Sequence, residues 1–142
     1  MDGGNGESVT KLIEMEKVDP VLIEKLRRIG IISVEGLLRA GATRADRLSI
    51  CVRSATTRGT VDALVQEADL IRITGVGPAF AHLLRRAGVH SVGELALADT
   101  TTLVDALFEA NLVLELLAHL PSDRQVSAWI WQAKKLDPVL EV

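Results

Sequence analysis

Hydrophobic positions recur three or four residues apart in two segments of the chain, and this spacing predicts amphipathic helices. In the segment after Pro20 they are Leu22, Ile23, Leu26 and Ile29, and in the segment after Pro78 they are Phe80, Leu83, Leu84 and Ala87. Proline suits the first residue of a helix because the N–H that it lacks has no partner within the helix there. No segment alternates apolar and polar residues as a strand does, so we expect an all-α fold.

The two segments belong to an internal repeat. Residues 18–38 align with residues 76–96 at an offset of 58 without a gap, and nine of the 21 positions are identical. Residues 61–70 and 126–136 resemble each other at an offset of about 65. We therefore expect a flexible tail (1–10) and two related units (11–70 and 71–142) with pseudo-twofold symmetry in one compact helical domain. One shared core should bury Leu26, Leu37, Leu84, Val92 and Leu95.

The residues at the predicted helix ends follow known capping preferences. Gly30 and Gly88 stand where a left-handed residue ends a helix. Ser33 and Ser91 are N-cap candidates for the next helices, and Ser91 with Glu94 predicts a capping box. Longer helices are expected to begin near Thr43, Thr57, Thr101 and Ser122, the last with a second capping box to Gln125.

Composition narrows the range of functions. Hydrophobic residues make up 48% of the chain and aromatic residues 3%, so Leu, Val, Ile and Ala must form the core. The net charge of −3 disfavours a dedicated nucleic-acid-binding protein, which is usually basic. The sequence has no apolar run long enough to cross a membrane and starts with a polar segment. We expect a cytoplasmic protein with no signal peptide and no membrane partner.

Residues that commonly carry catalysis or bind metals form no recognisable pattern. Cys51 is the single cysteine, and the three histidines lack metal-ligand spacing. Nucleophile-elbow, Walker-loop and paired-carboxylate motifs are also missing. The sequence therefore predicts no enzyme, no metal and no cofactor.

The repeated segment contains a motif at its second occurrence. Residues 73–78 read Ile-Thr-Gly-Val-Gly-Pro and precede a helix, which resembles the helix-hairpin-helix motif. Over residues 11–136 the chain resembles a tandem helix-hairpin-helix family of unknown function that carries a flap-endonuclease-like (helix-three-turn-helix) label. The shared features are both hairpins, the junction ADLIRITGVG and a closing helix of the W-I-x-Q-A-K type at Trp129 to Lys134. A flap nuclease also needs a separate catalytic domain, for which this chain is too short.

The resemblance implies a function for the second hairpin. In helix-hairpin-helix proteins, backbone N–H groups at the start of the second helix bind a nucleic-acid phosphate and do not recognise bases. The residues to which this role carries over are Gly75, Val76, Gly77, Arg72, Arg85 and Arg86. Glycines at positions 75 and 77 would let the phosphate approach closely, or would serve only a tight turn with positive φ angles.

The first hairpin is degenerate. Asp19 stands at the position of Gly77, where its carboxylate should cap its own helix and repel a phosphate. Arg27 and Arg28 match Arg85 and Arg86, and their presence in the degenerate copy favours a structural or solvated role for these arginines. Acidic residues are sparse in residues 39–58, which hold five arginines, and absent between Asp69 and Glu94.

Two functions stay open from the sequence. One is a non-catalytic module that binds a nucleic-acid backbone weakly and without sequence specificity through the second hairpin. The alternative is a scaffold module that binds a protein partner or a second copy of itself and no nucleic acid. Trp131 is a candidate for such an interface. Trp129 falls on the apolar face of the last helix, and helical spacing places Trp131 roughly 200° away from it, on the outward side. It should therefore be the more exposed tryptophan.

Overall fold

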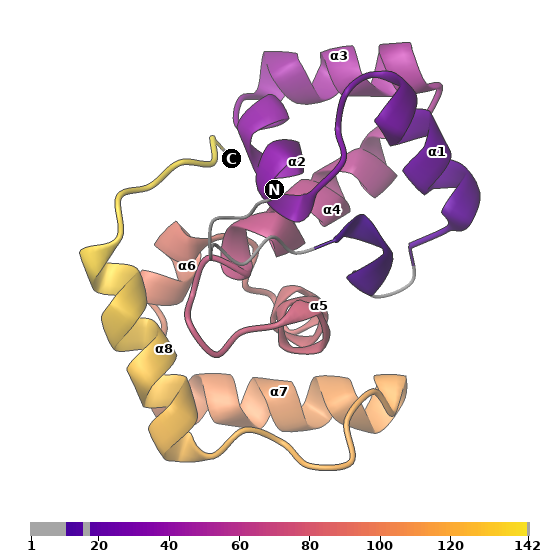
Figure 1. Cartoon of the computed structure of the whole chain (residues 1–142). Helices are drawn as coiled ribbons and strands as arrows, with labels where there is room; N and C mark the ends of the chain where they lie inside the picture. Colours follow the sequence, from indigo (N-terminus) through magenta and orange to yellow (C-terminus); the bar gives the residue numbers. More distant parts are fainter. Residues whose placement is uncertain (1–10, 16–17, 142) are drawn as a thin grey trace, which may run out of the picture.

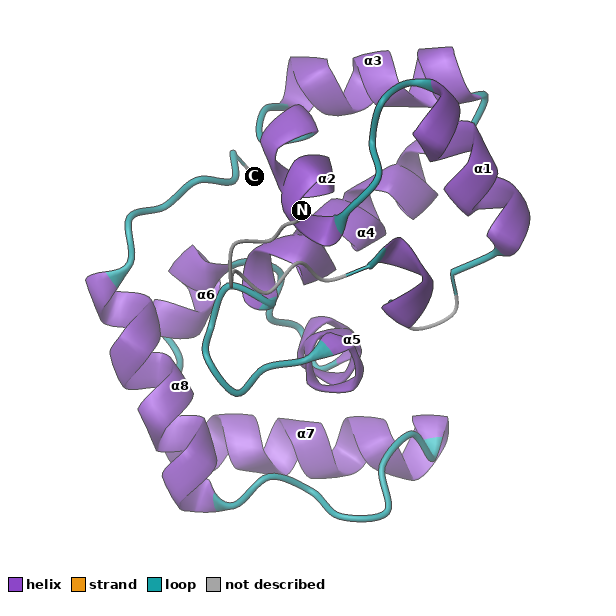
Figure 2. Ribbon diagram, viewed as in Figure 1, coloured by secondary structure: helices purple, strands orange, loops and turns teal. Residues whose placement is uncertain are grey.

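Helices account for all regular secondary structure in the residues that the computed structural model describes, 11–15 and 18–141 (Figures 1 and 2). The predicted tail, 1–10, lies outside these residues. A short 3-10 helix, η1 (Leu12–Glu14), comes first. The α-helices are α1 (Pro20–Arg28), α2 (Val34–Ala40), α3 (Arg44–Ser54), α4 (Arg58–Leu70), α5 (Pro78–Arg86), α6 (Val92–Ala96), α7 (Thr100–Leu114) and α8 (Asp123–Lys135). The expectation of an all-α fold is confirmed for this part of the chain.

Helices α1 and α5 end in the same way at positions 58 residues apart. Gly30 and Gly88 have φ angles of 92° and 104°, as expected for left-handed residues after a helix. The N–H of Ile31 donates to the carbonyl of Leu26 at 2.9 Å, and the N–H of Val89 donates to Leu84 at 3.0 Å. These are the bonds of a Schellman motif, which satisfies carbonyl groups at the end of a helix.

Side chains cap the starts of the following helices. The hydroxyl groups of Ser33 and Ser91 accept hydrogen bonds from the N–H groups of Gly36 and Glu94, both at 3.0 Å. The predicted capping box at Ser91 is wrong in one respect, because Glu94 accepts from the N–H of His90 rather than from that of Ser91.

The longer helices start close to the predicted residues. Thr43, Thr57 and Ser122 are N-caps, and the capping box between Ser122 and Gln125 is complete. Helix α7 begins one residue before the expected Thr101, because Asp99 caps it. The N–H and hydroxyl groups of Thr102 donate to Asp99 and hold the pKa of this carboxyl below its usual range.

The hydrophobic core lies in two clusters, not in the single shared core that the sequence suggested. One cluster contains buried residues of η1 and α1–α4, and the other extends from Leu70 through α5–α8 to Ala133. The partly buried Ile71 packs against both clusters. The five predicted core residues are all buried, at 0–1% exposure: Leu26, Leu37, Leu84, Val92 and Leu95. In Figure 1, α1–α4 lie above α5–α8, and the segment after α8 returns toward α2 and α3.

Candidate nucleic-acid interface

The turn before α5 has at Gly75 the positive φ angle that was expected of a tight turn. Gly75 has a φ of 95°, a left-handed conformation that side chains disfavour. Val76 follows with its side chain 3% exposed, and its N–H donates to the carbonyl of Ile73 at 3.0 Å. This N–H, which the resemblance assigned to a phosphate, is therefore already engaged within the turn.

Helix α8 fastens the same turn from the other side. The side-chain amide of Gln132 accepts a hydrogen bond from the N–H of Thr74 at 3.0 Å and donates one to the carbonyl of Thr74 at 3.1 Å. A Cβ atom added to Gly75 would lie 3.2 Å from Nε1 of Trp129. Trp129 also packs against Phe80 of α5, with ring centroids 5.0 Å apart. The group that approaches Gly75 closely is thus the side chain of Trp129 on α8.

Gly77 has a different role from Gly75. It is the N-cap of α5 with φ −92° and ψ −173°, so the predicted positive φ is wrong at this glycine. No side chain of the described residues caps the helix here, and a Cβ at Gly77 would meet none of their atoms within 4 Å. The first N–H groups of a helix have no partner within it, and Pro78 has none to offer. Among the described residues, the start of α5 is therefore free of a side-chain cap and has open space at Gly77.

The start of α1, which is equivalent to the start of α5, is capped by a side chain. Asp19 is the N-cap of α1, and its Oδ1 accepts from the N–H of Val21 at 2.8 Å. The prediction that this carboxylate caps its own helix is confirmed. A negative charge at the helix start takes the place that a phosphate would need.

The three arginines of the predicted site have different surroundings. Arg72 donates to Asp69 at 3.0 Å and to the carbonyl of Asp137 at 2.9 Å. Nε of Arg85 donates to Glu67 at 2.7 Å. Arg86 is exposed, and its side chain makes no hydrogen bond or ion pair with another described residue. Two of the three cations are thus engaged within the fold, and Arg86 faces solvent.

A buried polar cluster under α5 was not foreseen. Glu67 of α4 has a side chain 3% exposed, and its Oε2 accepts from Arg85 and lies 2.9 Å from Nδ1 of the buried His82. Oε1 of Glu67 and Nε2 of His82 have no hydrogen-bond partner in the described part of the chain. Glu67 follows the buried Leu64 by three residues, and this helical spacing was the signal that it faces inward.

Asp69 is a second buried acid that the sequence did not single out. It is 1% exposed, and its Oδ2 accepts from the N–H of Val92, the first residue of α6, at 2.7 Å. Its Oδ1 accepts from Arg72. The carboxylate thereby joins the end of α4 to the start of α6, and it fixes the segment that leads into the turn.

Trp131 lies on the outer face of α8. Its exposed fraction is 61%, against 3% for Trp129, so the prediction that it is the more exposed tryptophan is confirmed. Nζ of Lys135 sits 4.0 Å from the centre of its ring, a cation–π contact along the helix surface.

Within residues 11–15 and 18–141, no group of three or more His, Cys, Asp or Glu side chains is arranged to hold a metal ion. In the same residues no helix has the length and apolar character needed to cross a lipid bilayer.

The described residues thus form an all-α fold in which α5 begins without a side-chain cap. Residues 16–136 match the family DUF4332, a domain of unknown function, and the chain belongs to this family. No curated protein and no solved structure matches the chain.

Proposed function

We propose that this chain is a non-catalytic helix-hairpin-helix module that binds a nucleic-acid backbone, without sequence specificity, at the start of α5. The observation that carries the proposal is the open N-terminus of α5 at Gly77, where no side chain within residues 11–15 and 18–141 caps the helix. A helix start offers N–H donors and a positive dipole end, and a phosphate is a natural occupant. Because the contact is made by the backbone, it distinguishes no bases.

The proposal includes a duplication of the helix-hairpin-helix unit about a pseudo-twofold axis, with residues 11–70 and 71–142 as its two copies. The matching Schellman bonds after Leu26 and Leu84 and the matching caps at Ser33 and Ser91 support it. The copies differ where function is expected, since Asp19 closes the first helix start. One copy then binds and the other supports the fold.

Arg86 contributes a second, separate contact in this proposal. It ends α5, roughly 13.5 Å along the helix from Gly77 at 1.5 Å per residue, so the two would meet different phosphates. With so few contacts and a net charge of −3, binding should be weak and strongly salt-dependent. The proposal also places this protein in the cytoplasm.

A second candidate function is a protein-interaction or scaffold module without nucleic-acid binding. Exposed apolar side chains on α7 favour it, because Phe108, Leu112 and Val113 are 52%, 63% and 80% exposed. Trp131 adds a large exposed aromatic ring on α8. Aromatic residues are enriched at protein interfaces, and exposed apolar patches often mark them.

A titration of labelled duplex DNA followed by fluorescence anisotropy separates the two functions. If the chain binds a nucleic-acid backbone, it should bind the duplex with an affinity that falls as salt is raised. If it is a scaffold module, the anisotropy should not change, and light scattering should show a dimer or a larger species.

A further inference from the structure

The outer side of α7 exposes large apolar side chains. Phe108, Leu112 and Val113 are each more than half exposed, whereas Leu103 and Leu107 of the same helix are buried. Helix α7 thus packs on its own core with one side and presents apolar groups to solvent on the other. An exposed apolar patch of this kind commonly marks a place where another protein packs.

The charge around these side chains is negative. Residues 87–123 contain six Asp or Glu residues and no Lys or Arg. Asp105 and Glu109 are exposed on α7, and their side chains make no hydrogen bond or ion pair with another described residue. They lie three residues before Phe108 and Leu112, so they share the same side of the helix. The acidic face of α7 consists of Asp105, Phe108, Glu109, Leu112 and Val113.

Helix α3 also exposes apolar side chains, and these have cations beside them. Leu48 and Val52, one helical turn apart, are 51% and 75% exposed. Arg53 donates to the carbonyl of Ile29 at 3.2 Å, and Lys25 donates to the carbonyl of the residue that follows α3 at 3.4 Å. A carbonyl group carries no net charge, so these contacts neutralise neither cation. The basic face consists of Lys25, Leu48, Val52 and Arg53.

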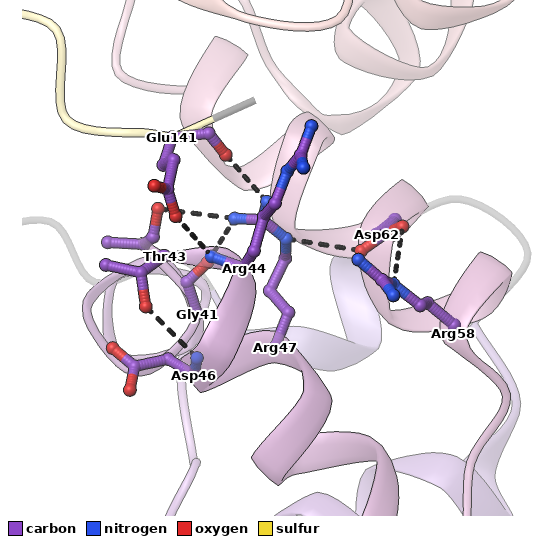
Figure 3. A network of polar contacts seen from close by, with 9 residues as sticks. Gly41, Thr43, Arg44, Asp46, Arg47, Arg58, Asp62 and Glu141 are labelled. Atoms are coloured by element: carbon purple, nitrogen blue, oxygen red, sulfur yellow. Dashed lines mark hydrogen bonds and ion pairs between the residues drawn. The ribbon is translucent and has the colours of Figure 1, made fainter.

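The other cations of α3 are engaged within the fold and do not belong to this face. Arg47 is buried, its Nη2 donates to the carbonyl of Glu141 at 2.6 Å, and its Nε lies 3.2 Å from Asp62 (Figure 3). Arg44 also makes contacts within the chain, among them a hydrogen bond from its N–H to the carboxylate of Glu141. The cations that a second copy can contact therefore lie at the C-terminal end of α3.

The acidic and basic faces belong to opposite ends of the molecule. In Figure 1, α3 runs along the upper edge and α7 along the lower edge, with α4 and α5 between them. The packing agrees, because α3 packs against α1, α2 and α4, whereas α7 packs against α5 and α8. The two faces of one chain therefore do not meet each other.

We propose that the chain associates with itself head to tail, so that the acidic face of one copy packs on the basic face of the next. The exposed apolar side chains of α7 and α3 pack together, and the two cations pair with Asp105 and Glu109. Opposite charge favours this contact, whereas pairing of α7 with α7 of a second copy would bring like charges together. A contact between two different patches forms a ring or an open chain of copies. This assembly goes beyond nucleic-acid binding and does not use the start of α5.

Sedimentation of the full chain over a concentration series tests the contact. At low salt we expect species larger than the monomer as the concentration rises to about 1 mM. Physiological salt should weaken the association at least about threefold, because it screens the charges of the two faces.

A double serine variant on each face removes its apolar side chains. Leu112→Ser with Val113→Ser alters the acidic face, and Leu48→Ser with Val52→Ser alters the basic face. Each variant should weaken self-association at least about tenfold. Both should fold by circular dichroism, because the replaced side chains are exposed. Ile13→Ser, at an exposed residue of η1, is the control and should associate like the unmodified chain.

The charge of the acidic face can be tested without changing its apolar side chains. Asp105→Asn with Glu109→Gln should also weaken self-association, and the remaining association should depend less on salt. This variant replaces the serine variant of α7 if that one unfolds.

A mixture of the two serine variants distinguishes a head-to-tail contact from a twofold one. Each variant retains one unaltered face, so we expect two samples that are monomeric alone to form a 1:1 complex when mixed. Three results would overturn the proposal: a monomeric unmodified chain at about 1 mM and low salt, unchanged association of the basic-face variant, and a mixture that stays monomeric.

A titration of labelled duplex DNA with the same variants keeps this proposal separate from nucleic-acid binding. Neither serine variant alters Gly77, so both should bind DNA like the unmodified chain. Loss of DNA binding by the basic-face variant, with unchanged self-association, would assign the α3 face to nucleic acid and contradict the proposed contact.

Discussion

Nε of Arg85 lies 2.7 Å from Oε2 of Glu67, a carboxylate whose side chain is 3% exposed. The neighbouring Arg86 is exposed, so two consecutive arginines of α5 have opposite environments. Arg85 compensates a buried charge, and removal of one partner from a buried pair leaves the other uncompensated. The guanidinium group of Arg85 therefore stabilises the fold.

This difference makes the two arginines a matched pair for mutation. We expect Arg85→Gln to lower the free energy of unfolding by about 2 kcal/mol, less than for a fully buried pair because Arg85 is partly exposed. Arg86→Gln should leave stability unchanged and weaken DNA binding severalfold, because it removes one phosphate contact. Urea denaturation and DNA titration of both variants measure these effects. Equal stability of the two variants would contradict the structural role of Arg85.

Gly75 and Gly59 form a second matched pair. Gly75→Ala should destabilise the protein by about 1–2 kcal/mol, because alanine disfavours a φ of 95° and its Cβ would crowd Trp129. Gly59→Ala places a methyl group on α4, where nothing lies within 4 Å, and should be neutral or stabilising. Chemical denaturation of both variants gives the comparison. If Gly75→Ala is as stable as the unmodified protein, Gly75 is not needed for the packing of α8.

Trp131 should be the tryptophan that iodide quenches. In Trp129→Phe the remaining Trp131 is 61% exposed in the monomer, whereas in Trp131→Phe the remaining Trp129 is buried. We expect strong quenching in the first variant and weak quenching in the second. Sedimentation of the same samples gives the oligomeric state. Shielding of Trp131 that appears only in a dimer would support an interface, and shielding in a monomer would contradict one.

The sequence predicted what depends on local spacing and failed where distant segments meet. Helical periodicity and capping preferences identified the buried Leu26 and Leu84 and the caps at Ser33 and Ser91. Glu67 and its pairing with Arg85 went unnoticed because the partners lie on different helices, 18 residues apart. The contact between Gly75 and Trp129 joins two elements that only the tertiary fold brings together.

The two motif glycines show the same limit within one turn. Both were expected to allow positive φ angles or the approach of a phosphate. Gly75 has the positive φ, and it faces Trp129. Gly77 is extended and open. A sequence motif identifies both glycines, but the packing of the surrounding helices determines which of them a ligand can reach.

The open helix start at Gly77 is the centre of the proposed function, and Gly77→Asp tests it most directly. The substitution reproduces the carboxylate cap seen at Asp19, and the free space around Gly77 leaves room for the side chain. The variant should therefore fold with unchanged or slightly raised stability. A carboxylate there would occupy the N–H donors and repel a phosphate.

The decisive measurement is the anisotropy titration of labelled duplex DNA with the unmodified protein and with folded Gly77→Asp, each at low and at physiological salt. We predict that the unmodified protein binds weakly, with an affinity that falls as salt is raised, and that Gly77→Asp shows no detectable binding. Equal affinity of the two proteins for DNA would contradict it, as would a complete absence of binding by the unmodified protein at low salt.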